Sequence, residues 1–266
     1  MSVLQRESST RRRKNLGQHM LISEETAIEI VKISEIRKGD TVFEIGTGRG
    51  LLTLHLAQRA TKVITCDLDS HLLEEAKSRL KGFANITFLR GNAFVPPICK
   101  TRFDVCVTSL PYSRSREFIE WLAFANKRRF RSCTAVVQSE FAHKLVALPG
   151  REEYRFVSVL AQILFGIEIV KGISRYDFDP VPGVSSSIIR LVPRNDSGLD
   201  SFASAHARLL RNIFSFRGRL LRSAVRKTPE LMKCSRELRE EWQNRRVEQL
   251  QPQEILSILE LACSPK

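Results

Sequence analysis

The sequence predicts an α/β fold with a mainly parallel sheet covered by helices, followed by a small helical C-terminal domain. Short runs rich in Val, Ile, Leu and Phe alternate with helical stretches along most of the chain. This rhythm is typical of a parallel sheet with helices on both faces. A glycine-rich turn follows the first of these runs. After residue 196 the strand-like runs stop and two basic helical stretches take over.

The expected elements follow one another in a regular order. Ser23, a residue that can cap a helix, precedes two acidic residues and apolar residues at helical spacing, so the first helix is expected over 24–36. Helices are then expected between the apolar runs, because parallel strands need crossover connections. The expected strands are 41–45, 62–67, 86–90, 103–109, 133–138, 168–173 and 186–192, and the later helices are 51–60, 71–80, 116–127, 139–148 and 153–164.

A change in composition marks the domain boundary. Residues 193–200, PRNDSGLD, have the Pro, Asn, Asp and Gly content of a connecting segment. We therefore expect a flexible basic arm at 1–14, a main domain at 15–196 and a helical domain at 197–266. No internal repeat is present.

The charge of the chain indicates a polyanionic partner. Lys and Arg total 43 against 29 Asp and Glu, which gives a formal net charge of +14. An excess of this size favours nucleic acid, because neutralising phosphates releases counterions. The alternative is a basic protein whose charges are only solvated.

Cysteine and histidine patterns do not indicate a metal site. The six cysteines show no C-x-x-C pairing, which favours buried, reduced thiols, and the five histidines lack ligand spacing. No apolar run approaches the roughly 18 residues of a membrane span, and the N-terminal arm has no apolar segment. We expect a soluble cytoplasmic protein without membrane association.

The glycine-rich turn predicts a nucleotide-like ligand. Gly46, Gly48 and Gly50 follow the strand 41–45 at alternate positions, where glycine permits a tight turn and close approach of a ligand to the backbone. The spacing is G-x-G-x-G and not the G-x-G-x-x-G that seats a pyrophosphate. It therefore favours a nucleoside without a diphosphate, and a tight strand-to-helix turn without a ligand stays open as the alternative.

Two further strand ends carry polar residues. Asp67 follows the glycines by about 20 residues, where an acid accepts hydrogen bonds from ribose hydroxyls in such folds. Asp69 is expected instead to stabilise a helix N-terminus. Asn92 can bind an adenine edge, or it can serve only in a turn. Together these residues fit S-adenosylmethionine better than NAD.

The strand 103–109 leads into Ser-Leu-Pro-Tyr. The exocyclic amine of a nucleobase is a poor nucleophile, because its lone pair is delocalised into the ring. The Ser109 hydroxyl and the Leu110 carbonyl can accept hydrogen bonds from that amine and aim its lone pair at a methyl donor. Pro111 rigidifies the turn and Tyr112 offers a face to an extruded base. The alternative is a loop without function.

Several ordered motifs resemble those of the rRNA adenine dimethyltransferases, the KsgA family, and of their Erm relatives. The motifs are RRKNLGQHML, VFEIGTGRGLLT, VVQSEFAHKLVALPG, YRFVSVLAQ, YDFDPVPGVSSSIIRL and FSFRGRLLRSAV, and the resemblance covers nearly all of residues 11–228. It implies a Rossmann-like class I methyltransferase domain that uses S-adenosylmethionine. It also implies rRNA or a small ribosomal subunit precursor as partner, and we expect a monomer.

The resemblance implies roles for individual residues. Tyr112 and Phe178 would hold the target base, and the Asp-Pro-Val-Pro surroundings of Phe178 favour an exposed, rigid loop over a core position. His19 has an alternative role in which it only supports the N-terminal segment. The implied cofactor contacts are Gln18, His19, Leu21, Gly46, Gly48, Asp67, Asn92 and Ser109. The expected RNA contacts in the basic C-terminal helix are Arg217, Arg219 and Arg222.

Two residues depart from the family pattern. The family usually has Asn where this chain has Ser109, and Asp where it has Asn92. Ser109 keeps one acceptor oxygen on a shorter arm, while Asn92 loses a charge-assisted bond to the cofactor. We expect N6-dimethylation of adenosine in small-subunit rRNA. N4-methylation of cytidine in rRNA and a non-catalytic RNA-binding role in ribosome assembly stay open as alternatives.

Overall fold

The structure, a computed structural model, describes residues 19–124, 130–194 and 202–263. The expected arm at 1–14 lies outside these ranges. Contacts divide the chain into two compact units. The first unit comprises Met1–Ala142 and Glu168–Pro193, and the second comprises His143–Ile167 and Arg194–Lys266. The segment 143–167, which we expected in the main domain, is therefore grouped by its contacts with the C-terminal helices.

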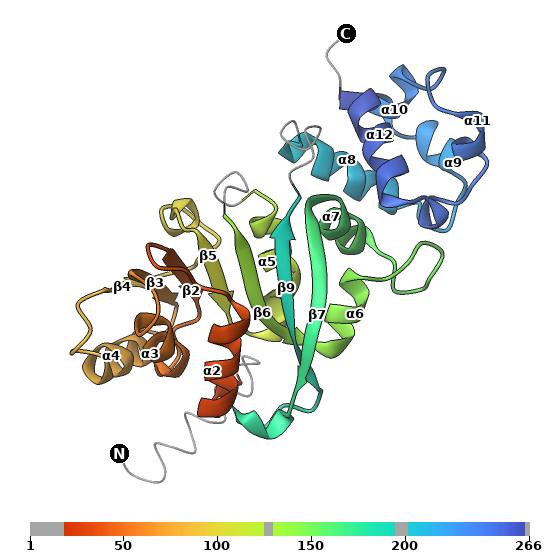
Figure 1. The fold of residues 1–266 in the computed structure, drawn as a ribbon. Helices are drawn as coiled ribbons and strands as arrows, with labels where there is room; N and C mark the ends of the chain where they lie inside the picture. Colours follow the sequence, from red (N-terminus) through yellow and green to blue (C-terminus); the bar gives the residue numbers. More distant parts are fainter. Residues whose placement is uncertain (1–18, 125–129, 195–201, 264–266) are drawn as a thin grey trace. The chain divides into compact units, whose positions relative to one another are not determined.

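A seven-stranded sheet has the order β4-β3-β2-β5-β6-β9-β7 (Figure 1). Its neighbouring pairs from β4 to β6 are parallel, and β9 is antiparallel to β6. This confirms the predicted mainly parallel sheet. The strands are β2 (Thr41–Ile45), β3 (Lys62–Asp67), β4 (Ile86–Arg90), β5 (Val105–Thr108), β6 (Ser132–Gln138), β7 (Phe165–Ile173) and β9 (Ser186–Pro193).

Helices follow the strands as the alternating pattern predicts. The helix α2 begins after Ser23, whose hydroxyl accepts a hydrogen bond from the Thr26 N–H at 3.2 Å, so the predicted cap is confirmed. The α-helices up to residue 164 are α2 (Glu24–Ile33), α3 (Leu51–Ala57), α4 (Ser70–Arg79), α5 (Ser115–Leu122), α6 (Ser139–Leu145) and α7 (Phe156–Leu164). The short 3-10 helices are η1 (Ile98–Lys100), η2 (Tyr112–Arg114) and η4 (Arg175–Asp177).

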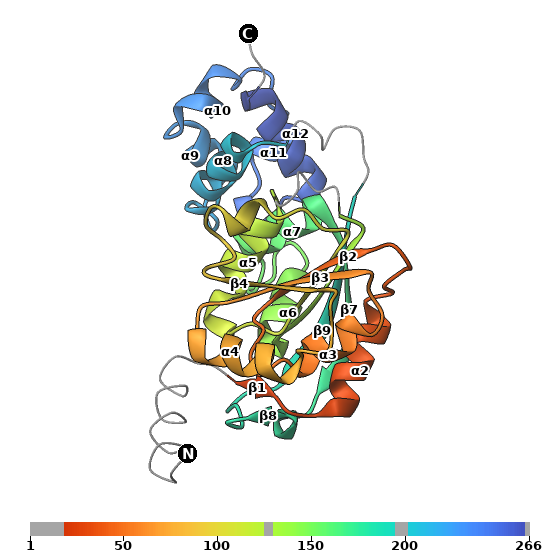
Figure 2. The same cartoon turned by 90° about the vertical axis from the view of Figure 1, so that its left-hand side faces the viewer.

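Successive residues of β2 point to opposite faces of the sheet, as the pleat requires. Val42 joins a core cluster to which the adjacent helices α2 and α3 contribute their buried apolar residues (Figures 1 and 2). Phe43 instead contacts the ring of Trp121 in α5, with centroids 6.0 Å apart. The sheet is thus covered by α2 and α3 on one face and by α5 on the other. The polar residues at the carboxyl ends of the parallel strands lie between these two layers, along one edge of the sheet that we call the carboxyl edge.

Two features at this edge were not predicted. A two-residue strand β1 (Met20–Leu21) pairs antiparallel with β8 (Phe178–Asp179), and the two lie side by side in Figure 2. The antiparallel direction of β9 places its first residue, Ser186, opposite Gln138, the last residue of the parallel strand β6. The start of β9 therefore lies at the carboxyl edge of the parallel strands.

The second unit is helical beyond residue 202. In it α12 packs against α7 and α8. The side chain of Tyr154 is fully buried, and its hydroxyl donates to the Leu250 carbonyl oxygen at 2.9 Å. Its elements are α8 (Ser204–Phe214), α9 (Leu221–Val225), α10 (Pro229–Lys233), α11 (Glu240–Gln243), η6 (Val247–Gln249) and α12 (Pro252–Cys263). No helix in the described ranges is long and apolar enough to cross a membrane.

Candidate active site

The glycine turn after β2 lies against the start of the Ser-Leu-Pro-Tyr segment. Gly46 has a φ of +90°, which L side chains rarely adopt, and its N–H donates to the Cys66 carbonyl oxygen at 2.9 Å. A Cβ atom at this position would be 3.6 Å from the Ser109 carbonyl oxygen. Gly48 has a φ of +53°, and a Cβ there would be 3.2 Å from Met20 Sδ. The turn therefore adjoins both the N-terminal segment and the segment after β5.

Asp67, at the end of β3, holds the glycine turn in place. Its Oδ2 accepts a hydrogen bond from the Gly48 N–H at 2.9 Å, and its Oδ1 accepts one from the Asp69 N–H at 2.9 Å. Burial raises the pKa of Asp67, and the backbone N–H groups of Asp69 and Gly48 oppose this rise. Each carboxylate oxygen keeps a further lone pair, which can accept a hydrogen bond from a ligand hydroxyl.

Asp69 has the structural role expected for it. It caps α4 by accepting hydrogen bonds from the His71 N–H at 2.9 Å and the Leu72 N–H at 3.3 Å. Asn92 makes a comparable local turn, because its Oδ1 accepts a hydrogen bond from the Phe94 N–H at 3.0 Å. The turn role of Asn92 is thus present, and its contact with an adenine edge stays a prediction.

Tyr112 is held from two sides. Its hydroxyl lies 2.5 Å from Ser186 Oγ, and its ring stacks on His19 with centroids 5.5 Å apart and planes 27° apart. His19 Nδ1 lies 2.6 Å from the Pro180 carbonyl oxygen. Because a carbonyl can only accept, this nitrogen carries the proton. Burial raises the pKa of Tyr112, so the phenol stays protonated at neutral pH. His19 thus supports Tyr112 directly, and its contact with the cofactor stays a prediction.

The exposed position expected for Phe178 is wrong. Phe178 is only 1% exposed and belongs to the core cluster of the first unit. Its pairing with Leu21 in the β1–β8 ladder places it before the Pro-rich loop and not within it. That loop is exposed, with Val181 and Val184 at 45% and 47%. In this conformation the ring of Phe178 cannot offer a face to a base.

The three arginines expected to bind RNA differ in exposure and in contacts. Arg217 is paired with Glu248 at 2.9 Å and donates to the Glu152 carbonyl oxygen at 3.2 Å, with its side chain 26% exposed. This corrects the assignment of Arg217 to RNA binding, because its guanidinium is already bound to two residues of the second unit. Arg219 and Arg222 are exposed, and Arg222 donates to Asn244 Oδ1 at 3.3 Å. Their contact with RNA stays a prediction.

The remaining predicted residues are placed as follows. Ser109 is half-buried directly after β5, Leu110 is buried, and Pro111 begins the turn that leads into η2. Leu21 packs against the core cluster. Gln18 lies outside the described residues. No group of three or more His, Cys, Asp or Glu within the described ranges is arranged to hold a metal ion.

Sequence reasoning missed Glu44, a fully buried carboxyl under the glycine turn. Its Oε2 accepts hydrogen bonds from Thr53 Oγ1 and Thr65 Oγ1, both at 2.6 Å. Thr65 in turn accepts from Thr47 Oγ1 of the glycine turn at 2.6 Å. Burial raises the pKa of Glu44 to about 8. An acidic residue inside an otherwise apolar strand was the signal that could have identified it.

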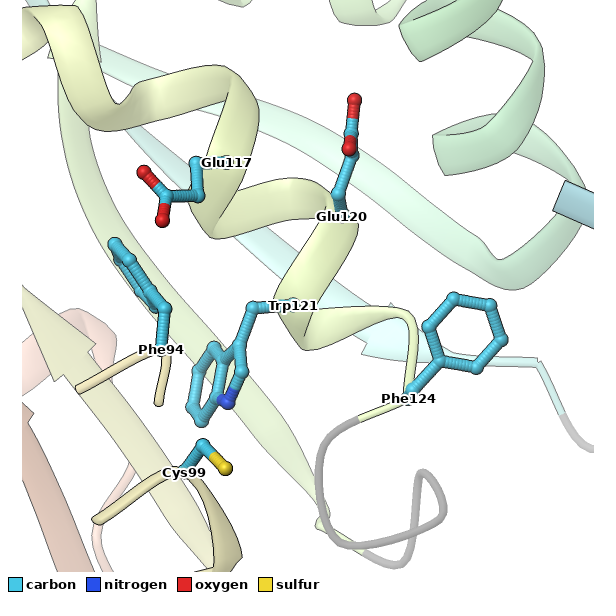
Figure 3. A pocket seen from close by; sticks show the side chains of 6 residues that line it. All are labelled: Phe94, Cys99, Glu117, Glu120, Trp121 and Phe124. Carbon is cyan, nitrogen blue, oxygen red and sulfur yellow. The ribbon is translucent and has the colours of Figure 1, made fainter. Parts of the chain in front are cut away.

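A separate open pocket of about 370 Å³ lies beside α5 (Figure 3). Its carboxylates are already paired, Glu117 with Arg114 at 3.1 Å and Glu120 with Arg116 at 2.9 Å. None of the residues predicted for the site lines it. The lining residues are Phe94, Cys99, Glu117, Glu120, Trp121 and Phe124.

Comparison with known proteins gives consistent results. The sequence profile described as "Ribosomal RNA adenine dimethylase" matches residues 9–263. The chain is 32% identical to "Probable ribosomal RNA small subunit methyltransferase A" of Methanosarcina mazei, over 91% of this chain and 89% of the relative. It is 35% identical to "Probable dimethyladenosine transferase" of Caenorhabditis elegans, over 67% of this chain and 58% of the relative.

The solved structures include a protein of similar fold. A dimethyladenosine transferase from Plasmodium falciparum aligns with a TM-score of 0.77 and 25% identity. The alignment covers 90% of this chain and 96% of that protein. The similarity therefore extends over both units of the chain.

Proposed function

Because the chain belongs to the ribosomal RNA adenine dimethylase family, we propose that it dimethylates N6 of adenosine in small-subunit rRNA. Members of this family are rRNA methyltransferases that use S-adenosylmethionine. The archaeal relative named as a small-subunit methyltransferase matches over nearly the whole chain, which supports the choice of subunit. The nematode and Plasmodium proteins are named dimethyladenosine transferases, which supports adenosine as the target.

The residues of the glycine turn fit the methyl donor. The positive φ of Gly46 and its lack of a side chain leave the backbone open beside Ser109. Asp67 would accept hydrogen bonds from the ribose hydroxyls through the lone pairs that Gly48 and Asp69 leave free. Asn92 would contact the adenine edge. When bound, S-adenosylmethionine supplies an electrophilic methyl group on its sulfonium.

The segment after β5 would act on the target base. The Ser109 hydroxyl and the Leu110 carbonyl would accept hydrogen bonds from the exocyclic amine and orient its lone pair. Tyr112 would present its ring to the extruded base. No general base is required, because the proton of the amine can leave to water after attack. The observation that carries the proposal is the close approach of Gly46 to the Ser109 backbone. It supports a methyl donor bound at the glycine turn beside a target base bound at the segment after β5.

The two alternatives raised by Ser109 receive less support. Cytidine as the target rests on this one residue, whereas the names of the relatives that we compared refer to adenosine where they name a base. A non-catalytic role in ribosome assembly would not explain the arrangement of Asp67, the glycine turn and Tyr112, because RNA binding alone does not require a site for a methyl donor.

Nucleoside mass spectrometry tests the proposal directly. The protein is incubated with S-adenosylmethionine and with rRNA or immature particles of each ribosomal subunit, with the Asp67→Ala variant as control. We expect N6,N6-dimethyladenosine in small-subunit rRNA and none with the variant. N4-methylcytidine would change the target base. RNA binding without methyl transfer would favour the assembly factor.

The partner, the compartment and the oligomeric state are further parts of the proposal. We propose a cytoplasmic monomer that acts on rRNA or on a small-subunit precursor. Sedimentation velocity measures the oligomeric state, and cell fractionation measures the compartment.

A further inference from the structure

The strongest unassigned contact at the candidate site joins Tyr112 to Ser186. Their side-chain oxygens are 2.5 Å apart, although the residues are 74 positions apart in the chain. Ser186 is fully buried, whereas Tyr112 is half-buried. A fully buried serine therefore bonds the phenol oxygen of a tyrosine that is partly accessible to solvent.

The sheet explains why Ser186 is a firm point of attachment. It begins β9, and its backbone is in register with Gln138 at the end of β6. Because β9 is antiparallel to β6, this first residue lies at the edge where the parallel strands end. Ser186 thus belongs to the central sheet, while Tyr112 belongs to the turn after β5.

The ring of Tyr112 is restrained by two contacts of different kinds. The stack on His19 restrains the plane of the ring, since His19 is itself held by the Pro180 carbonyl. The hydrogen bond to Ser186 restrains the far end of the side chain. Without it only the stack on His19 would restrain the ring, and fixing the remaining motion of the side chain when a base arrived would cost conformational entropy.

We propose that Ser186 is a positioning residue of the methyl transfer, which acts by holding Tyr112 in the orientation that receives the target base. This inference rests on the proposed function. Ser186 does not touch the base or the methyl donor, and its effect passes through the Tyr112 hydroxyl. It predicts that loss of either hydroxyl has the same consequence and that loss of both has no further one.

The chain offers a matched control for the serine. Ser187, the next residue of β9, is also buried, and its Oγ lies 2.8 Å from Ser139 Oγ. Ser186→Ala and Ser187→Ala therefore each remove one hydrogen bond between a buried serine of β9 and another hydroxyl. Only the first of these bonds reaches Tyr112.

The kinetic experiment compares Ser186→Ala, Ser187→Ala, Tyr112→Phe and the double variant Ser186→Ala/Tyr112→Phe. Methyl transfer to rRNA is measured at saturating S-adenosylmethionine. We expect kcat to fall about fivefold to tenfold in Ser186→Ala, in Tyr112→Phe and in the double variant alike. Ser187→Ala should keep the wild-type kcat, and all four should keep the wild-type dissociation constant for S-adenosylmethionine.

A second readout does not depend on catalysis. The chain has three tyrosines, at 112, 154 and 176, so protein labelled with 3-fluorotyrosine should give three ¹⁹F resonances, with Tyr112 assigned through Tyr112→Phe. The Tyr112 resonance should shift in Ser186→Ala and stay unchanged in Ser187→Ala. A wild-type protein that transfers no methyl group would overturn the proposed function, while this spectrum still decides whether Ser186 holds Tyr112.

Three outcomes would overturn the inference. The losses of Ser186→Ala and Tyr112→Phe could add in the double variant. Ser186→Ala and Ser187→Ala could lower kcat or move the ¹⁹F resonance equally. Ser186→Ala could weaken S-adenosylmethionine binding as much as it lowers kcat. Each would show that Ser186 acts on the fold or on the cofactor site and not through Tyr112.

Discussion

The polar side chains at the carboxyl edge of the sheet and the arginines of the second unit differ in how far other residues restrain them. At the edge, Glu44, Asp67 and Tyr112 all form hydrogen bonds with neighbouring strands or turns. In the second unit, Arg219 and Arg222 are exposed on the surface. Arg217 resembles the residues at the carboxyl edge, because its guanidinium is paired with Glu248 and bonded to the Glu152 carbonyl oxygen.

This difference separates two kinds of contribution. A side chain that several partners hold in one position can bind a ligand there with defined geometry. Removing it is therefore expected to have a large effect on one specific step. An exposed cation acts mainly through charge, so its loss is expected to be small, similar for every RNA sequence and dependent on salt. The following predictions test this contrast, starting with the largest effect.

The largest effect is expected in the pH dependence of stability set by Glu44. Burial raises its pKa from 4.5 to about 8, so between these values the folded chain holds a proton that the unfolded chain has lost. The contribution of Glu44 to the unfolding free energy therefore falls as pH rises, by roughly 3 to 4 kcal/mol between pH 5 and pH 8. The side chain introduced in Glu44→Gln has no proton to lose. The unfolding free energy of this variant relative to wild type should therefore rise by the same amount between pH 5 and pH 8.

Urea unfolding of both proteins at pH 5, 6.5 and 8 measures this difference. A difference between them that does not change with pH would show that Glu44 ionises normally. Burial at the edge would then affect the ionisation of Glu44 no more than exposure to solvent does.

The next effect is expected at Asp67. Asp67→Ala removes the acceptor that we propose for the ribose hydroxyls, and it also releases the N–H groups of Gly48 and Asp69. We expect S-adenosylmethionine to bind about a hundredfold more weakly, as measured by calorimetry.

Asp69→Ala is the matched control two residues further on. It should cost about 1 kcal/mol of stability through loss of the α4 cap and leave cofactor affinity close to wild type. Equal losses of affinity in both variants would mean that Asp67 acts only through the fold of the turn.

Tyr112→Ala should lower turnover and spare the cofactor. Base stacking on an aromatic ring contributes about 1 to 3 kcal/mol, so kcat should fall about ten- to a hundredfold. The dissociation constant for S-adenosylmethionine should stay unchanged, because the ring is proposed to contact the base and not the methyl donor. Tyr176→Ala, at a ring that is 66% exposed, should leave both values unchanged. Equal loss of turnover and cofactor affinity in Tyr112→Ala would refute its assignment to the base.

The smallest effect is expected in the second unit. Replacing Arg219 and Arg222 together by alanine should weaken RNA binding a few fold and reduce the slope of the salt dependence by about one for each phosphate that the variant no longer binds. Arg217→Ala should leave the salt dependence unchanged and lower the midpoint of thermal unfolding, because Glu248 loses its partner. Fluorescence anisotropy over a salt series measures the first effect. A salt slope that changes only in Arg217→Ala would reverse our assignment.

The strands at the edge could be predicted because local sequence specifies them. The predicted strands 41–45, 62–67 and 86–90 match β2, β3 and β4 residue for residue. In a parallel sheet all carboxyl ends meet at one edge, so the order of motifs along the chain was enough to bring Gly46, Asp67 and Ser109 to that edge. The contact between Gly46 and Ser109 agrees with this expectation.

Phe178 and Arg217 show where such reasoning fails. The Pro-rich loop was predicted as exposed, and Val181 and Val184 are exposed, but the pairing of β8 with β1 buries Phe178. The basic helix was predicted to present three arginines, but packing in the second unit uses one of them in an ion pair. Both errors concern which way a side chain faces, and neighbours distant in sequence decide that.

The amino-acid order alone was sufficient to predict the alternation of strands and helices, the glycine turn, the acid at the end of β3 and the family resemblance. These depend on side-chain periodicity and on short motifs, which act over a few residues. Tertiary packing alone placed Ser186 against Tyr112, buried Glu44 among three threonines and paired Arg217 with Glu248. Such contacts join residues that are between 9 and 74 positions apart. Their formation depends on strand direction and on the competition for burial across the whole fold.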